Sequence, residues 1–146
     1  MGDTLRLPEV HGERGLTVYT TMSTTCAACS RALPDLQALR EAFGIDELTL
    51  VGIPVSPEDT SPKLREYVER KDPAYGLQTD LPPSVRGRVC AAVAARLHGD
   101  GDATPASIVT DSSGLILAAR WGVPTVSELR RLRAHRERPI QTSQRW

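Results

Sequence analysis

The side chains best suited to chemistry in this sequence are two cysteines, Cys26 and Cys29, separated by Ala27 and Ala28. A C-x-x-C pair can exchange disulfides when one sulfur is a reactive thiolate and the other can displace it from a mixed disulfide. The pair can also form a structural bridge, supply half of a zinc site, or stay as two buried thiols. The elements around the pair decide which of these uses is favoured.

The sequence around the pair changes from a strand pattern to a helix pattern. Residues 16–21 are rich in β-branched and aromatic side chains, which predicts a buried strand, and Leu33, Leu36 and Leu39 recur at helical spacing. Cys26 is therefore expected at a helix N-terminus, where unpaired backbone N–H groups and the helix dipole stabilise a thiolate. One turn further on, the second cysteine is placed to resolve a mixed disulfide.

The other uses of the pair are weaker interpretations. On a chain-entropy model, a bridge within the C-x-x-C loop stabilises a fold by only about 2 kcal/mol, against about 4 kcal/mol for one that joins Cys26 to Cys90. A zinc site needs two more ligands, and Cys90 is accompanied by His98 rather than by a second C-x-x-C pair. We therefore predict no metal site. Inert buried thiols stay open as an alternative, because free cysteine packs well as a small hydrophobe.

A second informative stretch covers residues 103–122, where two β-like runs flank an Asp-Ser-Ser-Gly turn. This pattern predicts a β-hairpin, which the chain enters through Thr104 and Pro105. Residues 126–132 then show apolar side chains at helical spacing. The sequence thus predicts a hairpin followed by a helix.

These motifs resemble those of the thioredoxin-like superfamily, and within it those of TlpA/ResA-type proteins, which are extracytoplasmic thiol-disulfide oxidoreductases. In that family a C-x-x-C-x-x-x-x-P run opens the first helix, and Cys26, Cys29 and Pro34 match it. A Thr-Pro pair with a cis proline opens the closing hairpin beside the disulfide, and Thr104 and Pro105 match it.

The resemblance covers most of residues 14–134. It implies an α/β thioredoxin-like fold, with a central mixed β-sheet of about four to five strands flanked by helices. We expect a single domain over residues 1–138 and a frayed polar tail over residues 139–146.

The resemblance also implies separate roles for the residues at the site. Cys26 is expected to attack a substrate disulfide and Cys29 to resolve the mixed disulfide. Thr104 and Pro105 are expected to bind the substrate, with the backbone before the proline free to pair with an extended segment. This chemistry requires no cofactor.

The chain departs from the family pattern around the cysteines. Thr25 stands where the family usually has Trp, and Ala27 and Ala28 stand where Pro or Gly is common. The buried acid that thioredoxins carry six residues before the first cysteine falls on Thr20, and the glutamate three residues after the second falls on Ala32. Loss of a buried carboxylate is expected to slow the resolving step, because the inner thiol is harder to deprotonate.

Other side chains are expected to modulate the pair. Tyr19, Arg31 or an acid from another segment would take over proton handling, and Arg31 would add positive potential. Cys90, expected within a helix over residues 84–97, is either a buried small hydrophobe or a third redox thiol. Thr25 is the remaining candidate modulator. We therefore predict a specialised or weak oxidoreductase rather than a general disulfide reductase.

The segments between the motifs complete an α/β order. Residues 48–55 predict a second buried strand, parallel to the first. A proline-punctuated segment then leads into a helix that ends at about Arg70 and has Tyr67 among its inward-facing residues. Residues 75–79 are expected to form a short edge strand. His11 lies in a polar segment and carries no functional signal.

Composition excludes one class of partner. The 146 residues include 18 basic and 18 acidic side chains, so the formal net charge is 0 and no basic face for nucleic acid is expected. The arginine-rich stretch over residues 130–138 fits a solvated helix end, with contact to an anionic membrane or a partner as the alternative. The sequence shows neither a secretory hydrophobic segment nor a transmembrane span.

The function favoured by the motifs is thiol-disulfide exchange in protein substrates, in a setting such as cytochrome or oxidase maturation. It requires a protein disulfide or thiol substrate and a redox donor partner, and we expect a monomer. A non-catalytic thioredoxin-fold binding module and an SCO-like copper chaperone are the alternatives. The resemblance implies a periplasmic or extracytoplasmic location, with membrane attachment only through an anchor outside this sequence. A cytoplasmic location is the alternative.

Overall fold

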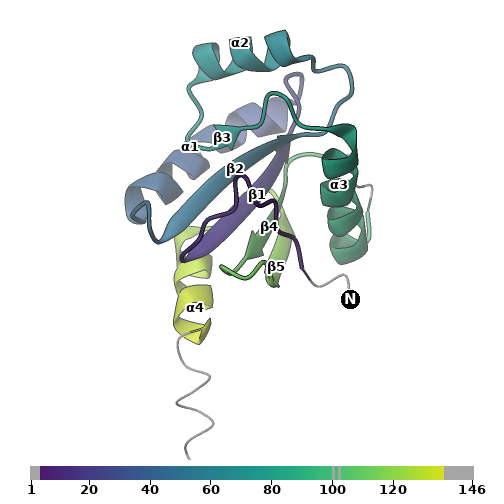
Figure 1. Cartoon of the computed structure of the whole chain (residues 1–146). Coiled ribbons are helices and arrows are strands. Elements are labelled where there is room, and N and C mark those ends of the chain that lie inside the picture. Colours follow the sequence, from purple (N-terminus) through teal and green to yellow (C-terminus); the bar gives the residue numbers. More distant parts are fainter. Residues whose placement is uncertain (1–3, 100, 102, 137–146) are drawn as a thin grey trace, which may run out of the picture.

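The sheet that positions the cysteines has five strands in the order β3-β2-β1-β4-β5 (Figure 1). The structure, a computed structural model, describes residues 4–99, 101 and 103–136. The strands are β1 (Leu16–Met22), β2 (Leu48–Pro54), β3 (Gly76–Leu77), β4 (Ala106–Thr110) and β5 (Ile116–Trp121). The helices are α1 (Ala27–Ala42), α2 (Ser61–Lys71), α3 (Pro83–Leu97) and α4 (Val126–Arg136). The predicted mixed sheet flanked by helices is confirmed.

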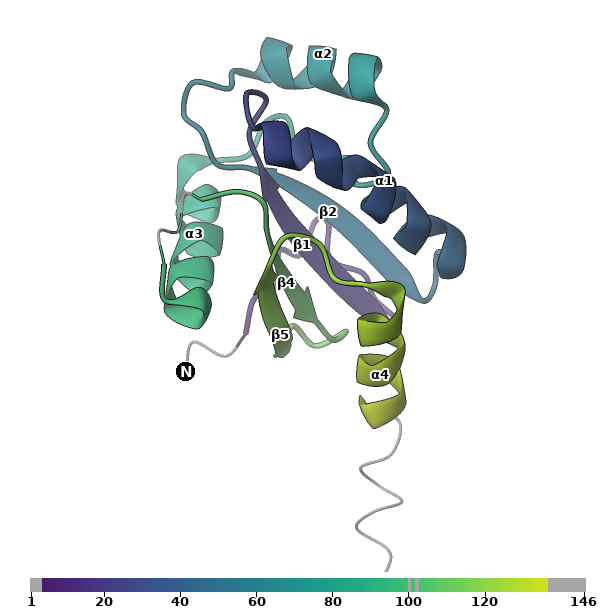
Figure 2. The same ribbon diagram turned by 180° about the vertical axis from the view of Figure 1, so that it is seen from behind.

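The central strand β1 runs parallel to β2 and antiparallel to β4. β3 adds a parallel edge strand beside β2, and β5 forms the antiparallel hairpin with β4. Because β1 and β2 point the same way, their carboxyl ends meet at one edge of the sheet. The chain leaves this edge toward α1 and α2, and α2 lies beyond it in both views (Figures 1 and 2).

Helices cover both faces of the sheet, with α1 and α4 on one face and α3 on the other (Figure 2). Successive side chains of a strand point to opposite faces, so β1 contributes to two hydrophobic cores. Leu16, Val18 and Met22 belong to the core under α1, which also contains Cys29. Tyr19 belongs to the core under α3.

The segment before β1 closes the core under α3. Leu5 and Leu7 are buried in this core. His11 is only 6% exposed. Its Nδ1 lies 2.8 Å from the Tyr19 hydroxyl and its Nε2 lies 2.9 Å from the carbonyl oxygen of Asp111. His11 was expected in polar surroundings, but its ring is buried and joins the N-terminal segment to β1 and to the turn after β4.

Element boundaries differ modestly from the predicted ones. The edge strand expected over residues 75–79 shortens to Gly76–Leu77, because it pairs with only two residues of β2. The helix expected from residue 84 begins at Pro83, a first-turn position that tolerates proline because its missing N–H would have no helical partner. The tail predicted over residues 139–146 lies outside the described residues, and the single domain over residues 1–138 stays a prediction.

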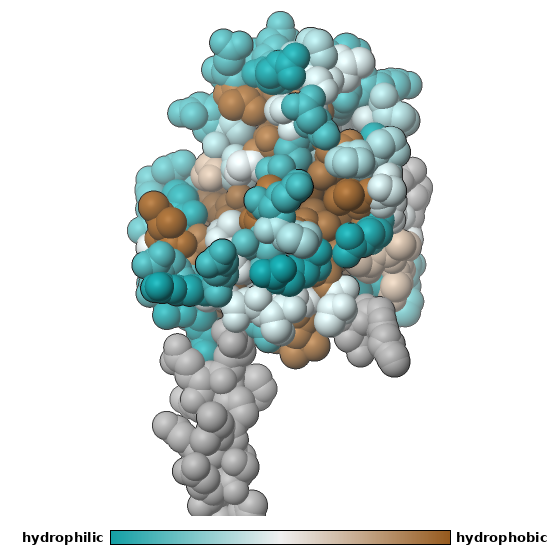
Figure 3. Space-filling model, in the orientation of Figure 1, coloured by the Kyte–Doolittle hydropathy of each residue, from teal (hydrophilic) through white to brown (hydrophobic). Residues whose placement is uncertain are grey.

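The outer surface mixes polar and apolar side chains. On the face shown in Figure 3, hydrophobic residues occur in patches between hydrophilic ones. Among the described residues, no helix has both the length and the apolar character that a membrane crossing requires.

Candidate active site

Cys26 occupies the N-cap of α1, immediately after the loop that follows β1. Its backbone is extended, with φ −84° and ψ 110°, and its Sγ accepts a hydrogen bond from the Cys29 N–H at 3.1 Å. The sulfur thus takes the place of the side-chain oxygen that usually caps a helix. Cys26 is half-buried and Cys29 is 3% exposed, and both are free thiols. The predicted strand-to-helix position of the pair is confirmed.

A proline loop from the other half of the chain faces the same sulfur. The Thr104–Pro105 peptide bond is cis, as the resemblance implied. The Cys26 thiol lies 3.7 Å from the Thr104 carbonyl oxygen and donates to it. Beside these residues is an open hollow of about 250 Å³ lined by Ser23, Val55, Ser56, Pro57 and Thr104. The cysteine that meets solvent therefore has a shallow surface next to it on which a partner chain could lie.

The two thiols differ in how easily they ionise. Burial opposes ionisation of Cys26, but hydrogen bonds from the Cys29 thiol, from Thr104 and from backbone N–H groups at the start of α1 outweigh it and lower the pKa of Cys26. Burial raises the pKa of Cys29 to about 12, and the neighbouring Cys26 sulfur adds to this increase. Cys26 is therefore the thiol available as a nucleophile, and Cys29 is held protonated.

The loop that carries Cys26 is fixed by an acid from a different segment. The Asp59 carboxylate accepts hydrogen bonds from the Thr24 backbone N–H, at 2.9 Å, and from the Thr24 hydroxyl. Thr25 is exposed, and its hydroxyl lies 3.1 Å from that of Ser23. Asp59 thus positions the loop before the first cysteine. Sequence reasoning missed this residue, because its partner lies 35 positions earlier in the chain.

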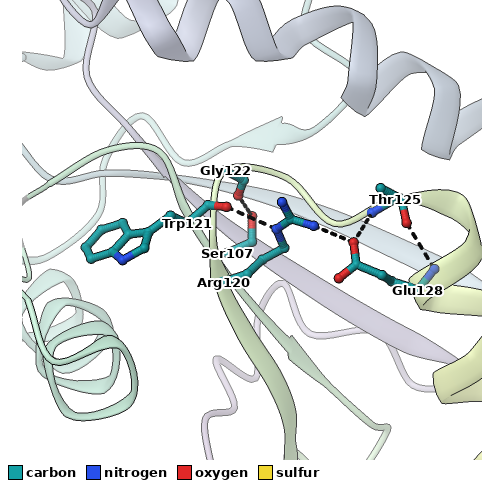
Figure 4. Close-up of polar contacts among 6 residues, drawn as sticks. All are labelled: Ser107, Arg120, Trp121, Gly122, Thr125 and Glu128. Atoms are coloured by element: carbon teal, nitrogen blue, oxygen red, sulfur yellow. Dashed lines mark hydrogen bonds and ion pairs between the residues drawn. The ribbon is translucent and has the colours of Figure 1, made fainter.

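A line of buried polar groups joins β1 to the proline loop. Thr20 stands at the position of the buried acid in thioredoxins, and its hydroxyl lies 2.9 Å from that of Ser107 on β4. The Ser107 hydroxyl donates to the carbonyl oxygen of Gly122 at 2.7 Å (Figure 4). The Gly122 N–H in turn donates to the Pro105 carbonyl oxygen at 2.8 Å. A neutral network therefore replaces the carboxylate and supports the loop that faces Cys26.

The start of α4 is held to the same hairpin end. Arg120 forms an ion pair with Glu128 and donates from Nε to the Trp121 carbonyl oxygen at 3.0 Å (Figure 4). Glu128 also accepts from the Thr125 N–H at 2.8 Å, and the Glu128 N–H donates to the Thr125 hydroxyl at 3.1 Å. This reciprocal cap fixes where α4 begins relative to Gly122.

The other predicted modulators lie in different parts of the fold. Arg31 is exposed on the surface of α1. Tyr19 belongs to the core under α3, on the face of the sheet opposite Cys29, and the partly buried Cys90 packs against that core. Tyr19 cannot take over proton handling at Cys29 from that face, and this expectation is wrong. Tyr67, predicted to face inward, and Tyr75 instead share the core that contains Cys29.

Metal binding depends on several His, Cys, Asp or Glu side chains that converge within the part of the chain that the structure describes. Within it, no group of three or more His, Cys, Asp and Glu side chains is arranged to hold an ion. His11 lies against Tyr19 under α3, and His98 forms the C-cap of α3. Neither of these histidines accompanies the cysteines as a ligand for copper.

Comparison with known proteins gives structural matches only. No family model matches the sequence, and no curated protein matches it. A thiol:disulfide interchange protein of the thioredoxin family from Chlorobium tepidum TLS superimposes with a TM-score of 0.59 at 21% identity, covering 84% of this chain and 80% of the other.

Two further solved structures agree with this match. StoA from Bacillus subtilis gives a TM-score of 0.57 at 18% identity, covering 84% of this chain and 83% of the other. A thiol-disulfide isomerase from Corynebacterium glutamicum gives 0.60 at 15% identity, covering 90% and 84%. The chain therefore has the thioredoxin-like fold.

Proposed function

We propose that this protein is a thiol-disulfide oxidoreductase that works through the Cys26–Cys29 dithiol. The observation that carries the proposal is the contrast between the two thiols. Cys26 caps α1 beside solvent and has a lowered pKa, whereas Cys29 is buried and its pKa is raised to about 12. The fold, shared with solved structures described as a thiol:disulfide interchange protein and a thiol-disulfide isomerase, supports the same chemistry.

The reaction proceeds by two sulfur displacements. The Cys26 thiolate attacks one sulfur of a substrate disulfide, so that a Cys26–substrate disulfide forms and the other substrate sulfur leaves as a thiolate. Cys29 then loses its proton and attacks Cys26 Sγ, which releases the second substrate thiol and leaves a Cys26–Cys29 disulfide. The substrate gains two electrons and the protein loses two. A donor dithiol restores the reduced pair, and the reverse sequence oxidises a substrate.

The substrate is a protein segment rather than a small molecule. The hollow beside Cys26 is shallow and open, and the Thr104–Pro105 loop presents backbone next to the sulfur. Such a loop can pair with an extended chain that carries the disulfide. The resemblance to TlpA/ResA-type proteins supports cytochrome or oxidase maturation as the setting and an extracytoplasmic location, and we expect a monomer.

The test is an equilibrium redox titration of the pair. The protein is poised in glutathione or dithiothreitol series, alkylated, and examined by mass spectrometry, with Cys90→Ser as the background that removes the third thiol. We expect one reversible two-electron transition, near −270 mV for a reductase or near −120 mV for an oxidant. Absence of a Cys26–Cys29 disulfide at every poise would refute the proposal and leave a thioredoxin-fold binding module.

A further inference from the structure

Two tyrosines in the core that contains Cys29 do not themselves react in the two sulfur displacements. Tyr67 on α2 and Tyr75 just before β3 are 1% and 5% exposed and belong to the same core as Cys29. Neither hydroxyl forms a hydrogen bond of ordinary geometry with any described residue. Buried polar groups in proteins are nearly always hydrogen-bonded, so two neighbouring exceptions beside a reactive sulfur indicate a partner that forms during the reaction.

The position of Tyr75 is set by a glycine. A Cβ added to Gly52 on β2 would lie 2.7 Å from the Tyr75 ring, so the ring rests directly on the backbone of that strand. Gly52 pairs with Thr20 in the parallel register of β1 and β2. The phenol therefore lies next to the strand position at which thioredoxins carry their buried acid, while Thr20 itself is engaged with Ser107.

The carboxylates of Asp111 and Asp59, which could otherwise assist ionisation of Cys29, are hydrogen-bonded elsewhere. Asp111 is the buried acidic side chain among the described residues, and its carboxylate accepts from the Ser113 and Leu115 N–H groups in the turn between β4 and β5. Asp59 is held by Thr24. The tyrosine hydroxyls are thus polar groups without a hydrogen-bond partner in the same core as the resolving thiol.

Electrostatic coupling supports the same placement. Burial raises the pKa of both tyrosines, and negative charge on Cys29 or Cys26 raises it further. The Tyr67 hydroxyl also lies near those of Ser30 and Tyr75. Both phenols therefore stay protonated while the cysteines react, and a protonated hydroxyl can turn its O–H toward a sulfur that becomes negative.

We propose that Tyr67 and Tyr75 stabilise the thiolate of Cys29 during the resolving step, in place of a buried carboxylate. This inference rests on the proposed function. Cys29 passes its proton to the departing substrate thiolate through solvent, its sulfur forms the bond to Cys26 Sγ, and the bond from Cys26 to the substrate breaks. The electron pair of that bond leaves with the substrate sulfur. The tyrosines keep their protons and supply hydrogen-bond donation to the Cys29 sulfur as its charge develops.

The experiment separates the two halves of the reaction. Tyr67→Phe, Tyr75→Phe and the double variant are mixed with oxidised glutathione, and the glutathionylated and internally oxidised forms are counted by acid quench and mass spectrometry across pH. The chain has three tyrosines, and Tyr19→Phe is the matched control because it removes a buried hydroxyl on the opposite face of the sheet.

We expect attack by Cys26 to change by less than about twofold in every variant. Resolution of the mixed disulfide should slow by roughly tenfold in the double variant, and its rise with pH should move to higher pH, because one hydrogen bond to a charged group is worth about that factor. Tyr19→Phe should leave both rates and the pH profile unchanged.

Two outcomes would overturn the inference alone. These are a double variant that resolves at the wild-type rate with the wild-type pH profile, and a Tyr19→Phe variant that is slowed equally, which would indicate general loosening of the fold. Failure of the wild-type protein to form either the mixed or the internal disulfide would instead overturn the proposed function, and this inference with it.

Discussion

The buried tyrosine hydroxyls on the two faces of the sheet differ in whether they are hydrogen-bonded. Under α3, the Tyr19 hydroxyl accepts from the Leu7 N–H at 3.2 Å and lies 2.8 Å from His11 Nδ1. Under α1, the hydroxyls of Tyr67 and Tyr75 have no such partner among the described residues. The first arrangement joins segments distant in sequence and is structural. The second leaves hydrogen-bonding capacity unused next to a sulfur that changes its charge, which is typical of a reactive site.

The largest expected effect comes from replacing one cysteine by serine on each face of the sheet. Cys26→Ser should remove all measurable disulfide exchange, because a serine hydroxyl does not ionise at working pH and cannot form the disulfide. Cys90→Ser is the matched change under α3 and should keep the wild-type rate. The measurement is the rate of reduction of a disulfide-containing test protein by the dithiol. An equal loss of this rate in both variants would contradict the distinction between a reactive and a structural face.

Removing a tyrosine hydroxyl should change the free energy of unfolding differently on the two faces of the sheet. Tyr19→Phe leaves the Leu7 N–H and His11 without their partner and should lower the free energy of unfolding by about 1–3 kcal/mol. Tyr67→Phe removes a buried hydroxyl that lacks a partner, so it should be neutral or slightly stabilising. Urea unfolding of the reduced proteins measures both. A loss of stability of the same size in each variant would show that the Tyr67 hydroxyl is also structurally engaged.

The loop before Cys26 provides a smaller test of positioning. Asp59→Ala removes the acceptor for the Thr24 N–H and hydroxyl, and should slow alkylation of Cys26 a few-fold while costing about 1 kcal/mol of unfolding free energy. The rate of reaction with iodoacetamide at several pH values measures the first effect. Asp111→Ala, which disturbs the distant hairpin turn, should reduce stability without changing the Cys26 rate.

The smallest expected effect is a pH dependence of stability from His11. Burial lowers the pKa of His11 below its ordinary value, so the unfolded chain binds the proton more readily than the folded one. Its contribution to stability is therefore complete above the unfolded pKa of about 6.5 and is lost as pH falls through the folded value. The geometry gives the same sign, because Nε2 donates to the Asp111 carbonyl and only a neutral ring leaves Nδ1 free to accept from Tyr19.

Urea unfolding between pH 8 and 5 measures this slope, with His11→Gln as the control in which the proton-binding group is absent. The control should lose the part of the slope that lies near pH 6. A wild-type protein whose stability rises as pH falls through this range would contradict the burial of a neutral ring.

The sequence was sufficient for the features that depend on local patterns. Residues 16–21 have the composition of a buried strand, and the cysteines fall where the helical spacing begins, so the N-cap position of Cys26 could be predicted. The cis bond before Pro105 followed from the resemblance and not from local physics. The strand and helix predictions succeeded because their periodicity is contained within short stretches of chain.

The features that escaped prediction all depend on long-range contacts. His11 was expected in polar surroundings, but its ring contacts the carbonyl oxygen of Asp111, 100 positions away. Asp59 looked like part of a helix start, and its contact with Thr24 spans 35 positions. The role proposed for Tyr75 depends on a glycine in a different strand. Such contacts follow from the way the strands are ordered, and no periodicity in the sequence reports them.

Gly52 and Tyr75 depend on each other for space. A methyl group at this position would occupy the space that the Tyr75 ring now fills. Chains that descend from a common ancestor with this one are thus expected to inherit the bare strand position and the aromatic residue as a unit. Where the glycine has been replaced, the ring should also be absent.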